Sequence, residues 1–142
     1  MNRLDRLRTL DAVNARPHAT PKDQLETKLD RAIANKAARL LDAQRLRAWA
    51  LAVKTRDQWR DRKTGVRVLR TLTLDPLRAE AHHIEPKANR DTRYDPRNGL
   101  CLSLTLHDAV ERGVYRIEGT QFFTVRGARY IDARFPVVFI RQ

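Results

Sequence analysis

The first third of the chain carries its apolar residues at helical spacing, whereas the rest carries them mostly in short extended runs. Leu4, Leu7, Leu10 and Val13 recur every three residues, which predicts a short helix over residues 2–15. Pro17 ends this helix, because the residue before a proline is pushed out of the helical region.

A second helical segment begins at Thr20. Thr20 suits the cap position, Pro21 suits the first turn, and Asp23 stands where a carboxylate meets free backbone amides. No glycine or proline interrupts residues 22–56. One apolar stripe follows this segment, and its members are Leu25, Leu29, Ile33, Ala37, Leu40 and Leu41.

As one helix, residues 22–56 would be about 50 Å long at ~1.5 Å per residue. That is long for a domain of 142 residues, so we expect a break near Asn35 or Asp42 and two helices packed on the core. The alternative is a continuous arm whose apolar stripe needs a partner, such as a second copy of the chain.

Beyond residue 56 the pattern predicts a small sheet with one embedded helix, over residues 104–112. Extended segments bounded by turn signals are expected at residues 66–74, 77–83, 114–117, 122–125 and 137–140. The third and fourth of these flank a turn and are predicted to pair as a hairpin. The expected fold class is α+β, with a helical N-terminal region over residues 1–53 and a core with C-terminal strands over residues 54–142.

The charge of the chain indicates what kind of partner it binds. The chain has 29 Lys and Arg against 17 Asp and Glu, a net charge of +12. Such an excess says little about fold but indicates an anionic partner such as nucleic acid. Basic residues gather between Lys54 and Arg70, a surface suited to phosphate contacts, and Trp49 and Trp59 beside them are expected in the core.

The sequence also excludes several kinds of structural site and membrane segment. The single Cys101 excludes an intrachain disulfide and a cysteine-based zinc ribbon. No apolar run approaches the ~18–20 residues of a membrane span, and Met1 is not followed by the apolar core of a signal peptide. We therefore expect a cytoplasmic protein with no membrane partner.

Three of the four histidines lie between Glu80 and Gly113: His82, His83 and His107. Hydrolysis of a phosphodiester at neutral pH needs a base to activate water and positive charge to stabilise the transition state. A histidine suits the first task and a divalent metal the second. Glu111, one helical turn after His107, is a candidate metal ligand, an acceptor for a histidine ring or a surface ion-pair partner.

The adjacency of His82 and His83 sets a geometric condition. Neighbouring residues of a regular strand point to opposite faces, so both can face one site only where the strand ends. Pro86 and the polar loop that follows it indicate such an end just after His83.

Three motifs in this order resemble the HNH endonuclease family, of the restriction and phage types, whose core is the ββα-metal fold. They are Ala81-His82-His83-Ile84-Glu85-Pro86, Tyr94-Asp95-Pro96-Arg97-Asn98-Gly99-Leu100, and Leu106-His107 through Arg112-Gly113. The resemblance covers about residues 54–117. Many relatives also hold a structural zinc with Cys-x-x-Cys pairs. This chain departs from them, so packing by the N-terminal helices is expected to replace the zinc.

The resemblance implies a role for each motif residue. His83 takes the place of the general base, and Asn98 that of the asparagine that orients it. His82 and His107 take the places of metal ligands, and Glu111 is a further candidate from its position on the helix rather than from the resemblance. The implied cofactor is one divalent ion, Mg²⁺ first, with Mn²⁺, Ni²⁺ or Zn²⁺ as alternatives.

The expected function is therefore a metal-dependent endonuclease that hydrolyses double-stranded DNA. The basic residues expected to hold the phosphate backbone are Arg60, Arg62, Lys63, Lys87, Arg90, Arg93 and Arg97. RNA remains open as a substrate. Two other interpretations are a non-catalytic nucleic-acid-binding protein on an HNH-like scaffold and a helical protein–protein adaptor that uses residues 20–56. A homodimer through the N-terminal helices is a further expected partner.

Overall fold

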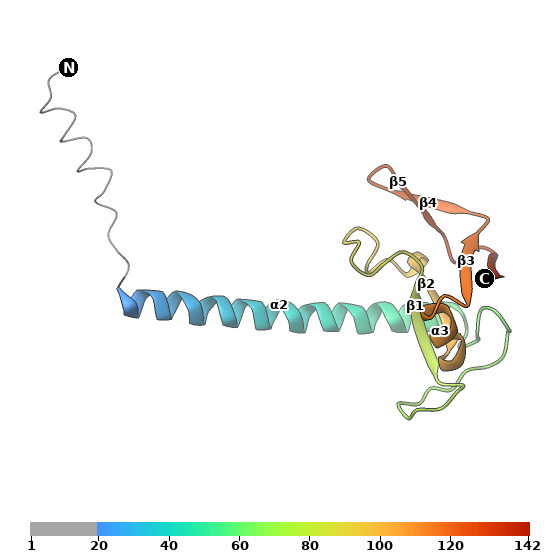
Figure 1. Cartoon of the computed structure of the whole chain (residues 1–142), viewed down its shortest axis with the longest axis horizontal. Coiled ribbons are helices and arrows are strands. Elements are labelled where there is room, and N and C mark those ends of the chain that lie inside the picture. The colour runs from blue at the N-terminus through green and yellow to red at the C-terminus, as the bar shows by residue number, and fades with distance from the viewer. Residues whose placement is uncertain (1–19) are drawn as a thin grey trace, which may run out of the picture. The chain divides into compact units, whose positions relative to one another are not determined.

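A computed structural model describes residues 20–142, which mix helices with small antiparallel sheets (Figure 1). The helices are α2 (Pro21–Arg56) and α3 (Leu104–Glu111), with a short 3-10 helix η1 (Pro96–Asn98). The strands form three two-stranded sheets. The predicted α+β class is thereby confirmed, whereas the predicted helix over residues 2–15 lies outside the described residues.

The helix α2 runs without interruption for 36 residues, so the expected break near Asn35 or Asp42 is wrong. Either residue costs a helix only tenths of a kcal/mol, and the surrounding Ala, Leu, Lys and Arg residues favour it. The predicted cap is confirmed. The Thr20 hydroxyl accepts from Asp23 N at 3.2 Å, and the Asp23 carboxylate accepts from Thr20 N at 2.9 Å.

Two compact units divide the chain between Leu40 and Leu41. The division predicted from the sequence, a helical region over residues 1–53 and a core over residues 54–142, stays a prediction. The C-terminal part of α2 carries Trp49 and Val53, which are buried in the second unit. Among the described residues, no helix combines the length and apolar character that a bilayer crossing requires.

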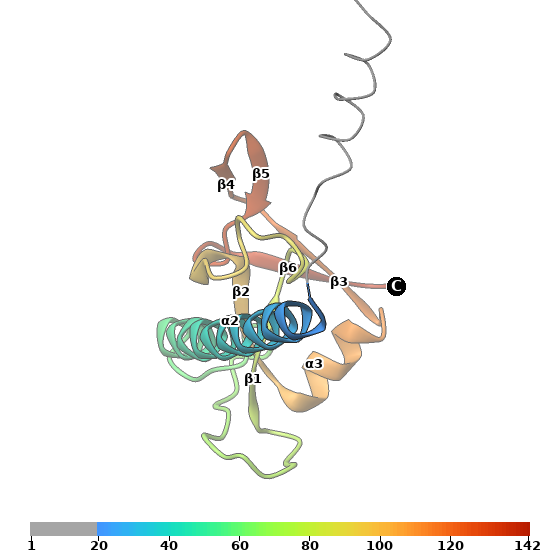
Figure 2. The same ribbon diagram turned by 90° about the vertical axis from the view of Figure 1, so that its left-hand side faces the viewer.

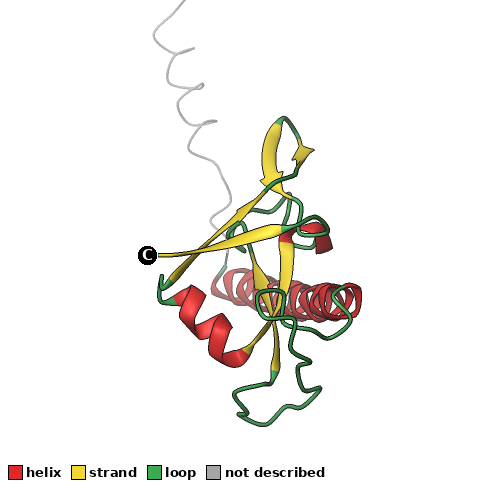
Figure 3. Ribbon diagram, turned by 90° about the vertical axis from the view of Figure 1, so that its right-hand side faces the viewer, coloured by secondary structure: helices red, strands yellow, loops and turns green. Residues whose placement is uncertain are grey.

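In the second unit, β1 (Ala79–His83) and β2 (Gly99–Ser103) pair antiparallel, and α3 follows β2 directly (Figure 3). The Ser103 hydroxyl caps α3 by accepting from Leu106 N at 3.3 Å. Gly113, at φ 74°, ends the helix in the left-handed conformation that glycine adopts readily. The extended segment predicted at residues 77–83 and the helix predicted at 104–112 are confirmed.

The strand predicted over residues 66–74 is wrong, because the segment forms only isolated bridges, such as Leu69 with Arg78. Leu72 and Leu74 are 98% and 85% exposed. Local side-chain bonds explain the departure from a strand. The Thr71 hydroxyl accepts from Thr73 N at 3.1 Å, and such bonds compete with the ladder of a sheet.

The C-terminal strands are β3 (Tyr115–Gly119), β4 (Phe122–Val125), β5 (Ala128–Ile131) and β6 (Val137–Arg141). Strands occur where residues 114–117, 122–125 and 137–140 predicted them, but the predicted hairpin is wrong. β3 pairs with β6, and β4 pairs with β5. Figure 2 shows the β4–β5 hairpin at the end of this unit away from α3.

A two-residue turn explains why β4 pairs with β5. Arg126 and Gly127 both have positive φ, 48° and 82°, and lie between the paired residues Val125 and Ala128. A turn with two positive φ angles matches the twist of the strands that it joins, so it closes a β4–β5 hairpin tightly.

The strand β2 has both faces buried. Leu100 and Leu102 pack with Ala133 on one face, while Cys101 packs with Val68 and Ala79 on the other. Burial raises the pKa of the Cys101 thiol to about 12, so it behaves as a small apolar group. Trp49 is buried, as expected, and Trp59 is half-buried against Cys101 and its neighbours.

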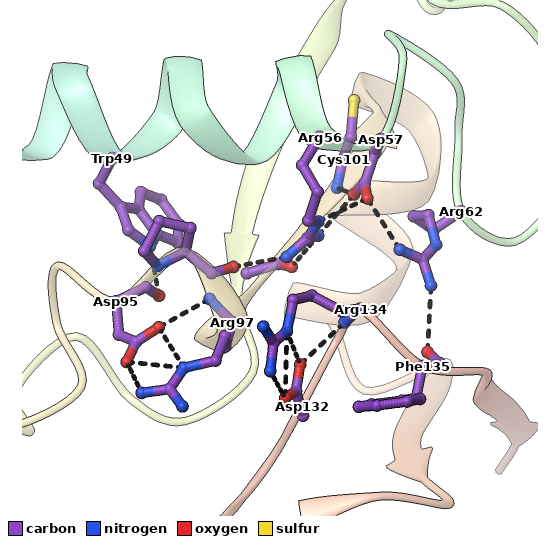
Figure 4. Close-up of polar contacts among 12 residues, drawn as sticks. Trp49, Arg56, Asp57, Arg62, Asp95, Arg97, Cys101, Asp132, Arg134 and Phe135 are labelled. Atoms are coloured by element: carbon purple, nitrogen blue, oxygen red, sulfur yellow. Dashed lines mark hydrogen bonds and ion pairs between the residues drawn. The ribbon is translucent and has the colours of Figure 1, made fainter. Parts of the chain in front are cut away.

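One edge of β2 pairs with β1, and the segment after α2 satisfies the other edge (Figure 4). The Asp57 carboxylate accepts from Cys101 N at 2.8 Å, and the Asp61 carboxylate accepts from Ser103 N at 2.7 Å. Arg56 and Arg62 each lie 2.8 Å from Asp57 and neutralise it. Two buried carboxylates thus act in place of a neighbouring strand.

Replacing Asp57 with alanine should lower the free energy of unfolding by about 3 kcal/mol, because Cys101 N and two arginines lose their shared acceptor. Urea denaturation followed by circular dichroism measures the change. The exposed Asp30→Ala is the matched control and should change the value by less than about 0.5 kcal/mol. Equal stabilities for the two variants would contradict the role of Asp57.

Candidate functional site

A cavity of about 770 Å³ opens where β1 ends. Residues from α2, from the end of β1 and from α3 line it, and all three predicted site histidines are among them. The strand β1 ends at His83, which meets the geometric condition set by the adjacent histidines. Both rings therefore reach one cavity.

His82, His107 and Glu111 form a cluster at this cavity. Their candidate ligand atoms all lie within 4.8 Å of one another. The His82 ring is in edge contact with the His107 ring, with centroids 5.4 Å apart. Glu111 Oε1 lies 3.2 Å from His82 Nδ1 and 3.9 Å from His107 Nε2. Two imidazoles and one carboxylate are a donor set that could hold a divalent metal ion.

His82 has the electronic state that such a ligand requires. Its Nδ1 is buried and has no hydrogen-bond partner in the described structure, although Glu111 Oε1 lies 3.2 Å away. Burial lowers the pKa of His82 to about 4, and the charge of His107 acts in the same direction, while Glu111 opposes it. At neutral pH the ring therefore presents an unprotonated nitrogen.

His83 is held differently, by a hydrogen bond and by stacking. Its Nε2 lies 2.9 Å from the carbonyl oxygen of Arg93. A carbonyl can only accept, so Nε2 carries the ring proton and Nδ1 keeps a free lone pair. Burial lowers the pKa of His83, with a smaller contribution from the charges of Lys87 and Arg93, against the effect of the Arg93 carbonyl.

Trp49 fixes the plane of the His83 ring. The two rings stack with centroids 3.6 Å apart and planes 9° from parallel. The Trp49 Nε1–H donates to the carbonyl oxygen of Asp95 at 3.0 Å, which fixes the indole in turn. The sequence indicated Trp49 only as a core residue, because no spacing pattern links position 49 on a helix to position 83 on a strand.

Asn98 closes the loop between β1 and β2. It is fully buried. Its side-chain oxygen accepts from Glu85 N at 2.7 Å, and its amide nitrogen donates to the carbonyls of Glu85 and Thr92 at 3.3 and 3.4 Å. Asn98 therefore ties the chain just after His83 to the chain just before β2, and does so from within the core.

The seven basic residues predicted to contact phosphates fall into two groups. Arg62, Arg93 and Arg97 are half-buried and form ion pairs with Asp57, Asp42 and Asp95, at 2.8, 2.6 and 2.6 Å. The exposed members are Arg60, Lys63, Lys87 and Arg90. Of all seven only Lys87 lines the cavity, together with Arg47 of α2, which the sequence did not single out.

Comparison with known proteins finds no matching family model, no matching curated protein and no matching solved structure.

Replacing Asn98 with aspartate keeps the shape of the side chain but sets a carboxylate oxygen against two carbonyl oxygens. We expect a loss of about 1–3 kcal/mol in the free energy of unfolding, because the carboxylate oxygen that replaces the amide nitrogen is buried without a donor, while the other oxygen keeps Glu85 N. Thermal or urea denaturation measures it. Asn35→Asp, on the exposed part of α2, is the control and should be nearly neutral. A neutral Asn98→Asp would show that the side chain does not hold the loop.

Proposed function

We propose that this protein is a metal-dependent endonuclease of the HNH type that hydrolyses phosphodiester bonds in double-stranded DNA. One observation carries the proposal: a histidine with a free Nδ1, His83, shares a cavity with the cluster of His82, His107 and Glu111. A candidate base and a candidate metal site thus stand side by side, as hydrolysis of a phosphodiester requires.

The local fold supports the same proposal. β1, β2 and α3 follow one another as strand, strand and helix, and the motifs that resemble the HNH family lie along them. The chain lacks the cysteine pairs of many relatives. Asp57 and Asp61 hold the outer edge of β2 instead, which is consistent with a core supported without a structural zinc.

His82 and His107 would hold the metal, with Glu111 as a third ligand. The buried Nδ1 of His82 fits this role, because burial favours a neutral ring at neutral pH and the atom faces Glu111, the third candidate ligand. A divalent ion bound there would supply the positive charge that stabilises the transition state and the leaving oxygen. Imidazole ligands suit transition metals better than Mg²⁺, so Mn²⁺, Ni²⁺ and Zn²⁺ have to be tested beside it.

His83 would act as the general base. Its Nδ1 would take a proton from a water molecule whose oxygen attacks the phosphorus, and the bond to the departing oxygen breaks. Trp49 and the Arg93 carbonyl hold the ring in the required orientation and tautomer. Such catalysis is typically worth about 10²–10⁴-fold. By resemblance to the family, the products would carry 5′-phosphate and 3′-hydroxyl ends.

The positive charge would bring the DNA to the site. Arg47 and Lys87 line the cavity, and the exposed Arg60, Lys63 and Arg90 lie elsewhere on a chain of net charge +12. If Z of these side chains contact phosphates, the affinity should fall with salt at a log–log slope of about −0.9Z.

Replacing His83 with alanine should lower the rate of plasmid nicking by about 10²-fold or more, because the base is lost. Supercoiled plasmid with Mg²⁺, Mn²⁺, Ni²⁺ or Zn²⁺ is the substrate, and a gel-shift assay measures DNA binding separately. His18→Ala removes the histidine that lies outside the motifs and should cleave like the wild type. Wild-type protein that shifts the plasmid but leaves it intact with every metal would indicate the non-catalytic nucleic-acid-binding alternative.

Replacing His82 with alanine should weaken binding of Mn²⁺ or Ni²⁺ by about tenfold or more, because a ligand is lost. Isothermal titration calorimetry without DNA measures this, so the result does not depend on cleavage. His18→Ala again serves as the control. Unchanged affinity in His82→Ala would place the metal elsewhere, whatever the cleavage assay shows.

A further inference from the structure

The part of α2 in the first unit has an apolar face that nothing covers in the described structure. Every residue from 20 to 40 is exposed. The large apolar side chains Leu25, Leu29, Ile33 and Leu40 are 58–68% exposed. A helix of this length draws most of its stability from packing its apolar face, so an uncovered face indicates a binding partner.

These side chains form one continuous stripe. At ~100° per residue, Leu25, Leu29, Ile33, Ala37 and Leu40 fall within about 120° of the helix circumference, the width of a face that packs on another element. The opposite face carries Lys28, Arg31 and Asn35. The stripe therefore suits a second helix with an apolar face of its own.

We propose that a second copy of the same chain covers this stripe, as an antiparallel pair of helices centred near Ile33. A two-fold interface requires a patch that is complementary to itself. With the axis near Ile33, the large Leu29 comes level with the small Ala37 of the other copy, and Ile33 meets its own counterpart. Large and small residues then alternate across the contact, as close packing requires.

Charge favours the antiparallel direction. Residues 21–30 contain two lysines and three acidic residues, a net charge of −1, whereas residues 31–40 contain three basic residues and no acidic one, a net charge of +3. A parallel pair would set +3 against +3, while an antiparallel pair sets −1 against +3. The antiparallel pair is therefore attractive along its whole length.

Glu26 also distinguishes the parallel from the antiparallel pair, because it lies within the apolar stripe. In a parallel pair the two copies of Glu26 would meet in the contact. In an antiparallel pair centred at Ile33 they lie about 21 Å apart at ~1.5 Å per residue, and each comes level with Leu40 of the other copy, one residue from Arg39. Lys22 of the same helix already lies 4.0 Å from Glu26, so what the antiparallel arrangement adds is the separation of the two Glu26 carboxylates.

Sedimentation velocity of the full chain, at concentrations up to about 100 µM, tests the self-association. We expect a dimer for the wild type and at least tenfold weaker dimerisation for Ile33→Glu. Asn35→Glu adds the same charge on the opposite face and should dimerise like the wild type. Circular dichroism checks that each variant is folded and helical.

The direction is tested by cross-linking single cysteine variants, since the native Cys101 is buried. Leu29→Cys mixed with Ala37→Cys should form a disulfide-linked pair, whereas Leu29→Cys alone should not. A monomeric wild type, an Ile33→Glu variant that dimerises like the wild type, or an Asn35→Glu variant that dissociates equally would overturn the dimer. Cross-linking of Leu29→Cys to itself would overturn the antiparallel direction.

Discussion

Two carboxylates at the end of α2 hold the open edge of β2, and the geometry of the site depends on them. Asp57 and Asp61 accept from the amides of Cys101 and Ser103, at positions where a third strand would otherwise pair. β2 sets the position of β1, which carries His82 and His83, and leads directly into α3, which carries His107. A buried carboxylate is costly without partners, and Arg56 and Arg62 meet that need for Asp57.

The adjacent histidines differ in what surrounds them, although their sequence neighbourhood is the same. His83 is fixed on one face by Trp49 and at Nε2 by a carbonyl, so one nitrogen only remains to react. His82 has a buried nitrogen with no hydrogen bond, turned toward His107 and Glu111. The two rings reach one cavity with different surroundings, because β1 ends at His83.

Local signals predicted the parts of the fold that local interactions decide. The cap at Thr20, the strand before Pro86 and the helix after Ser103 follow from residue types at short spacing. Other features depend on contacts that are distant in sequence or on competing local bonds. The turn at Arg126 and Gly127 pairs β4 with β5, and β3 therefore pairs with β6 instead of with β4. The stacking of Trp49 on His83 joins positions that no periodicity relates.

Close packing between α2 and β2 explains why residue 99 is a glycine, although an Asn-Gly pair usually indicates a turn. Gly99 has an ordinary extended backbone, yet a Cβ there would lie 2.5 Å from Val53 and 2.7 Å from Trp49. The same contact gives the protein an optical reporter. An indole stacked on an imidazole loses fluorescence when that imidazole gains a proton, and Trp59 lies in a separate cluster. With Trp59 replaced by phenylalanine, the emission of Trp49 would follow the charge of His83 in solution, with no label attached.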